Sequence, residues 1–241
     1  MHQLPQLLLL PGLAADERMW RDVLPHMPAA LRPAVVCAHQ DATLHSIEAF
    51  AERLLSLHTG PLILAGASMG GMVAMEAARQ NPARVVGLAL LGTTPRPETP
   101  DMRALREGAI ALFEQGRLRE VIEPNVALAF HPDNAADPAL VQAYLDLVLD
   151  AGAAQLIRQN RAVIERPDAR LHLPQVACRT LVLCGQADQL TPPECSEEIA
   201  ALVPGAELNL LPACGHMLTM EQPTAVSRHL VQWLERSGWA A

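Results

Sequence analysis

The sequence contains no lysine, so all 18 of its basic residues are arginines. Chemistry that needs a lysine amine, as a Schiff base or as an acid and base, is therefore excluded for this chain. Acidic residues number 26, and the formal net charge is −8. Because nucleic acids and anionic membrane surfaces attract clustered positive charge, this lack of basic residues argues against both as partners.

Paired cysteines and long apolar runs are also missing. The number of cysteines is odd, and no two of them have C-x-x-C spacing: Cys37, Cys178, Cys184, Cys195 and Cys214. This arrangement does not fit a disulfide framework. We interpret the cysteines as reduced thiols in a cytoplasmic protein. No apolar run approaches the roughly 20 residues that a membrane-spanning helix needs.

A short apolar stretch near the start, Leu7 to Leu10, is followed by small residues and so resembles a secretory leader. A signal peptide carries positive charge before its apolar core. Here only His2 precedes the stretch, the first arginine is Arg18, and Pro11-Gly12 interrupts the run after four residues. We therefore expect the stretch to be a retained part of the working protein.

The remaining composition is that of an ordinary globular protein. The chain has 241 residues, of which half are apolar and 18% are charged. This length suits one large α/β domain, or a domain with an insertion, and it can bury a substantial core.

Short apolar runs alternate with helical patterns along most of the chain. Each run is continuous and bounded by Gly, Pro or polar residues, as is typical of parallel strands whose two faces are both covered. The predicted strands are 7–10, 34–38, 62–65, 85–91, 180–184 and 207–211. The predicted helices of this part are 46–57, 70–80, 193–202 and 224–235. The pattern predicts a doubly wound α/β fold with a mostly parallel sheet of about six strands.

One region breaks the alternation, because no strand pattern occurs between about Thr94 and Arg170. The Pro-rich segment Pro95–Pro100 marks the point where the chain leaves the sheet. Helical patterns then follow at 102–115, 118–127, 138–149 and 153–165. We predict that residues 94–170 form a helical cap, and that residues 1–93 and 171–241 form the α/β core.

The strongest motif is G-x-S-x-G in "GASMGG", where a predicted strand runs directly into a predicted helix. In this strand–turn–helix context the pattern marks a nucleophile, here Ser68, lifted above the edge of the sheet. The turn is so tight that Gly66 and Gly70 are needed to avoid side-chain clashes. The helix N-terminus beneath the serine favours developing negative charge. An ordinary Gly-rich turn is the alternative.

A serine nucleophile needs a base, and nine histidines are available. His216 alone stands between the last predicted strand and the last predicted helix, beside Gly215. His131, within the predicted cap, is a surface residue or a substrate contact. The imidazole needs a carboxylate, and Asp188 lies just past the strand 180–184. Glu98 and Asp101, after the preceding strand, are alternative acids.

The motifs "GASMGG", "GQADQLTPP" and "CGHMLTMEQP" occur in the order Ser, Asp, His. In this order and at these intervals they resemble the α/β-hydrolase superfamily, especially its small, capped carboxylesterases and enol-lactonases. The likeness covers the chain from Leu7 to Trp233. The sequence departs from the family pattern in two respects. We expect the family's first antiparallel hairpin to be missing, because only six residues precede the first predicted strand. Pro11-Gly12 also replaces the common His-Gly after that strand.

The resemblance implies an oxyanion hole, in which two backbone N–H groups bind the oxygen that becomes negative during acyl transfer. One donor is Met69, which follows the nucleophile, and the other is Leu13, in the loop after the first strand. Gly12 lets this loop turn close to the substrate. Pro11 has no N–H and leaves the exact shape of the loop open, and a simple strand-ending turn is the alternative interpretation.

These observations predict a serine hydrolase of a small-molecule carboxylic ester or lactone, acting through an acyl-enzyme on Ser68. They imply neither a metal nor an organic cofactor, and they do not indicate an oligomeric state. Met72, Met217 and the apolar cap residues either line a substrate pocket or belong to the core. Acyl transfer, thioester hydrolysis, perhydrolysis and C–C bond hydrolysis use the same triad. A non-catalytic ligand receptor is a further alternative, although such a protein need not keep a complete triad.

Overall fold

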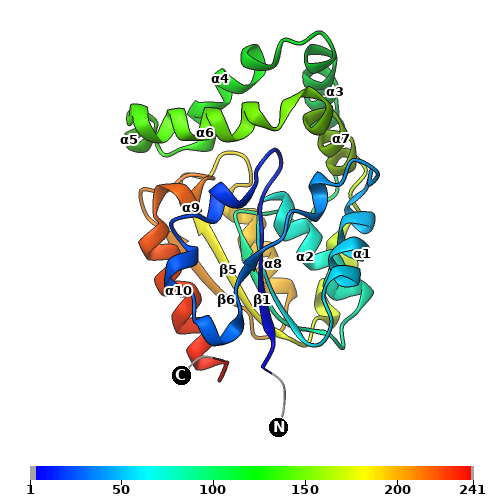
Figure 1. The fold of residues 1–241 in the computed structure, drawn as a ribbon, viewed down its shortest axis with the longest axis vertical. Helices are drawn as coiled ribbons and strands as arrows, with labels where there is room; N and C mark the ends of the chain where they lie inside the picture. The colour runs from blue at the N-terminus through cyan, green and yellow to red at the C-terminus, as the bar shows by residue number, and fades with distance from the viewer. Residues whose placement is uncertain (1–3, 240–241) are drawn as a thin grey trace.

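The computed structural model describes residues 4–239, and it contains a six-stranded sheet in which every neighbouring pair of strands is parallel. The strand order is β2-β1-β3-β4-β5-β6 (Figure 1). The strands are β1 (Gln6–Leu10), β2 (Ala34–Val35), β3 (Leu62–Ala67), β4 (Val85–Leu91), β5 (Arg179–Gly185) and β6 (Glu207–Leu211). The predicted doubly wound α/β fold is therefore confirmed, and the described residues hold no antiparallel strand.

The sheet has a hydrophobic core on each face, because successive strand residues point to opposite sides. Leu8 and Leu10 of β1 pack on the face covered by the helices α1 (Ile47–Leu57), α2 (Met69–Gln80) and α8 (Pro193–Leu202). Leu7 and Leu9 pack on the other face, against α10 (Pro223–Arg236) and residues of the inserted helices. Burial of each such leucine side chain stabilises the fold by about 1.5–3 kcal/mol. The continuous leucine run thus belongs to a strand buried on both faces.

The predicted strand at 34–38 is wrong in its length. Only Ala34 and Val35 pair with β1, and the chain then turns into a 3₁₀ helix at Ala38–Gln40. The turn brings the buried His39 against the carbonyl of Ala15. This tertiary contact, rather than a longer edge strand, decides the local backbone.

Five helices lie between β4 and β5, in the region where the sequence predicts an insertion. They are α3 (Pro100–Glu114), α4 (Leu118–Ala129), α5 (Pro132–Ala135), α6 (Pro138–Asp150) and α7 (Gly152–Ile164). The sequence did not predict the short α5, nor α9 (Leu218–Glu221) near the other end of the chain. Figure 1 shows these five helices as a layer above the end of the sheet where the strands finish.

Two further features bear on the sequence analysis: whether any helix could span a membrane, and whether the cysteines are paired. Between residues 4 and 239, no single helix has both the length and the apolar character to cross a membrane. The adjoining α6 and α7 reach those limits only when taken together, and they are bent by 85°. All five cysteines are free thiols, and three of them are buried.

Candidate active site

The turn between β3 and α2 places Ser68 at the end of the sheet. Ser68 has φ 53° and ψ −118°, a backbone conformation with positive φ that is unfavourable for any residue other than glycine. A β-carbon on Gly66 would lie 2.2 Å from the carbonyl oxygen of Gly70, and one on Gly70 would lie 2.2 Å from that of Leu10. Both positions therefore require glycine, which is the steric reason for the motif that the sequence shows.

Hydrogen bonds with the end of the neighbouring strand β4 hold the strained turn. The N–H of Ser68 donates to the carbonyl of Leu91 at 2.9 Å, and the hydroxyl of Thr93 donates to the carbonyl of Ser68 at 2.7 Å. Thr93 is fully buried after β4. The end of β4 thus holds both the N–H and the carbonyl of the serine.

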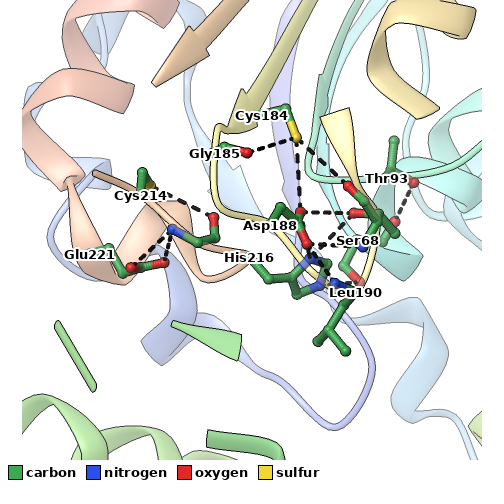
Figure 2. Close-up of polar contacts among 11 residues, drawn as sticks. Ser68, Thr93, Cys184, Gly185, Asp188, Leu190, Cys214, His216 and Glu221 are labelled. Carbon is green, nitrogen blue, oxygen red and sulfur yellow. Dashed lines mark hydrogen bonds and ion pairs between the residues drawn. The ribbon is translucent and has the colours of Figure 1, made fainter. Parts of the chain in front are cut away.

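Ser68, His216 and Asp188 form one hydrogen-bonded chain (Figure 2). The Nε2 of His216 lies 3.0 Å from the Oγ of Ser68, and its Nδ1 lies 3.0 Å and 2.9 Å from the two carboxylate oxygens of Asp188. Because a carboxylate only accepts, Nδ1 carries the proton and Nε2 presents its lone pair to the serine hydroxyl. This arrangement can accept the serine proton as the oxygen attacks a carbonyl carbon.

The carboxylate of Asp188 is buried and fully hydrogen-bonded. It accepts from the N–H groups of Leu190 and Thr191, both at 2.9 Å, and from the hydroxyl of Thr191 at 2.9 Å. Burial by itself would raise the pKa of Asp188. The charge of His216 and the hydrogen bonds from His216 and Thr191 outweigh burial, so the pKa of Asp188 lies below its ordinary value and the group stays ionised.

The two alternative acids lie elsewhere. The buried carboxylate of Glu98 forms ion pairs with Arg106 and Arg166 at 2.6 Å and 2.8 Å, at the beginning of the inserted region. Asp101 lies in the first turn of α3 and is exposed. The structure brings Asp188, and neither of these residues, to the imidazole of His216.

The proposed oxyanion donors flank Ser68. Met69 is the first residue of α2, and a β-carbon on Gly12 would lie 3.2 Å from the Cβ of Ser68, so the loop after β1 touches the nucleophile. Within residues 4–239, neither the Met69 N–H nor the Leu13 N–H donates to another protein group.

Other residues singled out from the sequence have structural surroundings. His131 is the N-cap of α5, where its Nδ1 accepts from the N–H of Asp133. Met72 and Met217 are buried in the two cores, and Met217 packs in the cluster that includes residues of the helices between β4 and β5. The described part of the chain contains no group of three or more His, Cys, Asp or Glu side chains that could hold a metal ion.

Sequence reasoning missed three residues that support the site: Thr191, Glu221 and Gln159. Thr191 bonds to Asp188, and the carboxylate of Glu221 accepts from the N–H of Gly215 at 2.9 Å beside His216 (Figure 2). Gln159, on α7, accepts from the N–H of Ala14 beside the predicted oxyanion donor. Thr191 and Glu221 stood within quoted motifs, whereas no local signal distinguished Gln159.

Comparison with known proteins agrees with the observed fold. The sequence model of the alpha/beta hydrolase family matches residues 7–229. Among curated proteins, the chain is 27% identical over 225 residues to a pimeloyl-[acyl-carrier protein] methyl ester esterase of Nitrosomonas europaea, and the match covers 88% of each chain.

Solved structures are also similar. A thermophilic esterase from Thermogutta terrifontis is 26% identical, with a TM-score of 0.83 over 98% of this chain and 91% of the esterase. The enol-lactonase of Burkholderia xenovorans has a TM-score of 0.83 at 20% identity, over 96% of this chain and 91% of the lactonase. At that identity, the second likeness concerns the fold alone.

Proposed function

The chain belongs to the alpha/beta hydrolase family, and from this premise we propose that it is a serine hydrolase that cleaves a carboxylic ester or lactone. The observation that carries the proposal is the 3.0 Å contact between the Oγ of Ser68 and the Nε2 of His216, with Asp188 on the far side of the ring. Relatives named as a methyl ester esterase and a thermophilic esterase support this class of substrate.

Acylation is the first half of the proposed reaction. His216 Nε2 takes the hydroxyl proton of Ser68 while Oγ forms a bond to the carbonyl carbon of the ester. The carbonyl oxygen becomes negative and accepts hydrogen bonds from the N–H groups of Leu13 and Met69. The bond to the alcohol oxygen then breaks, and His216 returns the proton to that oxygen. Asp188 holds the imidazole in the required tautomer and stabilises its positive charge.

Deacylation repeats these steps with water. His216 accepts a proton from the water as its oxygen attacks the acyl carbon on Ser68, and the same two N–H groups hold the oxyanion. Collapse of the intermediate breaks the bond to Oγ, releases the acid, and returns the proton to Ser68. No step needs a metal or a lysine. We also propose that residues 94–170 act as the cap that shields this chemistry from bulk water.

The test is hydrolysis of short-chain p-nitrophenyl esters by the wild type, Ser68→Ala and a control, Ser56→Ala. Ser56 is exposed on α1, and its hydroxyl donates to the carbonyl of Arg53 in the same helix. We expect the wild type and Ser56→Ala to hydrolyse these esters at equal rates, and Ser68→Ala to be inactive. A fluorophosphonate probe should label the first two only. An inactive, unlabelled wild type would contradict the proposal and favour a receptor.

The substrate class can be narrowed with the same preparations. We expect turnover of methyl esters, since a relative carries that activity in its name. Enol-lactones are assayed beside them, because the proposal includes lactones. Acyl thioesters and an added alcohol acceptor test the thioesterase and acyltransferase alternatives. Faster thioester turnover than ester turnover would move the assignment to thioester hydrolysis.

A further inference from the structure

The loop that presents Leu13 adopts a conformation that its own sequence does not favour. The N–H of Ala15 donates to the carbonyl of Gly12 at 3.3 Å, which closes a four-residue turn over residues 12–15. The third residue of the turn, Ala14, has φ 56°, where glycine is the favoured residue. A non-glycine residue in this region is strained, so contacts outside the turn have to maintain it.

Gln159 supplies such a contact from the inserted region. Its side chain is fully buried on α7. The Oε1 accepts from the N–H of Ala14 at 2.7 Å, and the Nε2 donates to the carbonyl of His39 at 3.1 Å. Since one partner is a donor and the other an acceptor, both ends of the amide are satisfied in only one orientation.

His39 completes the support on the other side of the turn. Its Nε2 lies 3.0 Å from the carbonyl of Ala15 and donates to it. Ala14 is thus held through its N–H by Gln159, and Ala15 through its carbonyl by His39. Gln159 also fixes His39 itself, through the carbonyl of that residue.

We infer that Gln159 is a positioning residue that sets the direction of the Leu13 N–H toward the oxyanion. The inference rests on the proposed function, in which Leu13 is one of two donors. Pro11 carries no N–H, and Gln159 holds the loop from α7 through the N–H of Ala14. The shape of the oxyanion hole therefore depends on α7 remaining packed against the core.

The first test compares Gln159→Met with Gln155→Met. Methionine keeps the length of the side chain and removes both hydrogen bonds. Gln155 lies one turn earlier on α7, and its buried Nε2 has no protein partner within residues 4–239. Because misplacing an oxyanion donor by about 1 Å costs on the order of 100-fold, we expect kcat for p-nitrophenyl acetate to fall about 10- to 100-fold in Gln159→Met, with little change in KM. Gln155→Met should match the wild type.

A transition-state analogue separates positioning from general damage. A trifluoromethyl ketone adds to Ser68 and places a negative oxygen in the oxyanion hole, so its affinity should fall by the same factor as kcat/KM in Gln159→Met. Affinity for the product acid, which makes no such oxyanion, should stay close to that of the wild type. Equal losses for both ligands would overturn the inference.

Gln159→Glu is the conservative variant. A carboxyl group keeps an acceptor for the Ala14 N–H, and kcat should therefore lie above that of Gln159→Met. Equal kcat in the two variants would overturn the role of that bond. Hydrogen exchange adds a readout without activity: the amide of Ala14 should exchange faster in Gln159→Met than in the wild type and Gln155→Met, and unchanged exchange would also contradict the inference.

The outcomes distinguish the two proposals. A wild type that hydrolyses no ester and takes up no fluorophosphonate would overturn the proposed function, whatever the exchange of Ala14. A wild type that is active, combined with a folded Gln159→Met that keeps full kcat and full affinity for the trifluoromethyl ketone, would overturn only the role of Gln159.

Discussion

The backbone N–H of His216 donates to the carbonyl of Ala129 at 2.9 Å, so the loop that carries the imidazole of His216 is bonded to the end of α4. The N–H of Met217 donates to the same carbonyl at 3.0 Å. The packing is tight here, because a β-carbon on Gly215 would lie 2.6 Å from the backbone of Phe130 and His131. The inserted helices thus contact both the histidine loop and the loop after β1.

Glu221 strengthens the first of these contacts. Its carboxylate accepts from the N–H groups of Gly215 and His131, at 2.9 Å and 2.8 Å, and from the side-chain amide of Asn134 at 2.7 Å. One carboxylate therefore joins the histidine loop to the beginning of α5. Hydrogen bonds to a charged acceptor are among the stronger ones in proteins.

Glu221→Gln should lower both stability and activity. Glutamine has one acceptor oxygen, and its NH₂ group would face a backbone N–H, so at least one bond is lost and one donor is left unpaired. We expect a loss of about 1–3 kcal/mol in unfolding free energy, measured by denaturant titration, with a fall in kcat. Glu123→Gln, an exposed change on α4, is the control. Equal stability of the two variants would show that the contact contributes nothing.

Asp188→Asn should abolish most of the activity while leaving the fold intact. The amide NH₂ would face Nδ1 of His216 and favour the tautomer with its proton on Nε2, which cannot accept from Ser68. Replacements of this kind lower kcat by about 10⁴-fold. Steady-state kinetics on a p-nitrophenyl ester measures the loss, and circular dichroism checks the fold.

Glu98→Gln is the matched test of the rejected acid. This change breaks ion pairs with Arg106 and Arg166 and should lower the melting temperature. It should leave kcat near that of the wild type. A loss of kcat as large as that of Asp188→Asn would make Glu98 the acid of the triad.

Gly70→Ala and Gly108→Ala should change stability in opposite directions. A methyl group on Gly70 would lie 2.2 Å from the carbonyl oxygen of Leu10, and such overpacking costs about 1–3 kcal/mol or more. Gly108 lies exposed inside α3 with no atom within 4 Å of the added carbon. Alanine there should raise the unfolding free energy by about 0.5–1 kcal/mol. Destabilisation by Gly108→Ala would contradict the placement of Gly108 at an exposed, uncrowded position inside α3.

The sequence alone predicted the features that local physics imposes. Apolar runs bounded by Gly, Pro or polar residues revealed all six strands. The bounds of β4 and β6 are as predicted, β1, β3 and β5 are one or two residues longer, and the edge strand β2 is three residues shorter. The glycines around Ser68 are required by backbone contacts of 2.2 Å, which makes the turn visible as a motif. Because Asp188 follows β5 and His216 follows β6 in a parallel sheet, both were expected at the same edge, where the strands end.

The supporting contacts could not be predicted in the same way. Gln159 and Ala14 are separated by 145 positions, and nothing local distinguishes Gln159 from Gln155 one turn earlier. The length of β2 depended on His39 reaching Ala15, another contact set by packing. These features arise from how the inserted helices sit on the core, and a single sequence does not encode that as a periodic pattern.

Buried His39 should make the protein less stable in mild acid. Burial lowers the pKa of His39 from its ordinary 6.5 to about 4, with the Arg158 charge acting in the same direction and the hydrogen bond to Ala15 opposing it. Between these values the unfolded chain binds a proton at His39 that the folded chain does not. Unfolding free energy therefore falls as pH falls from about 6.5 to about 4, by about 3 kcal/mol from this residue.

The difference between the wild type and His39→Gln isolates this contribution, since all other titrating groups are common to both proteins. Glutamine can still donate to the carbonyl of Ala15 but takes up no proton in this range. Urea titrations at pH 7 and pH 4 should show a larger acid-induced loss of unfolding free energy in the wild type than in His39→Gln. His45→Gln, at an exposed position, should follow the wild type. If His39→Gln lost as much stability as the wild type on acidification, His39 would be protonated in the folded protein, and its ring could not be the neutral, buried donor that holds the turn beside Leu13.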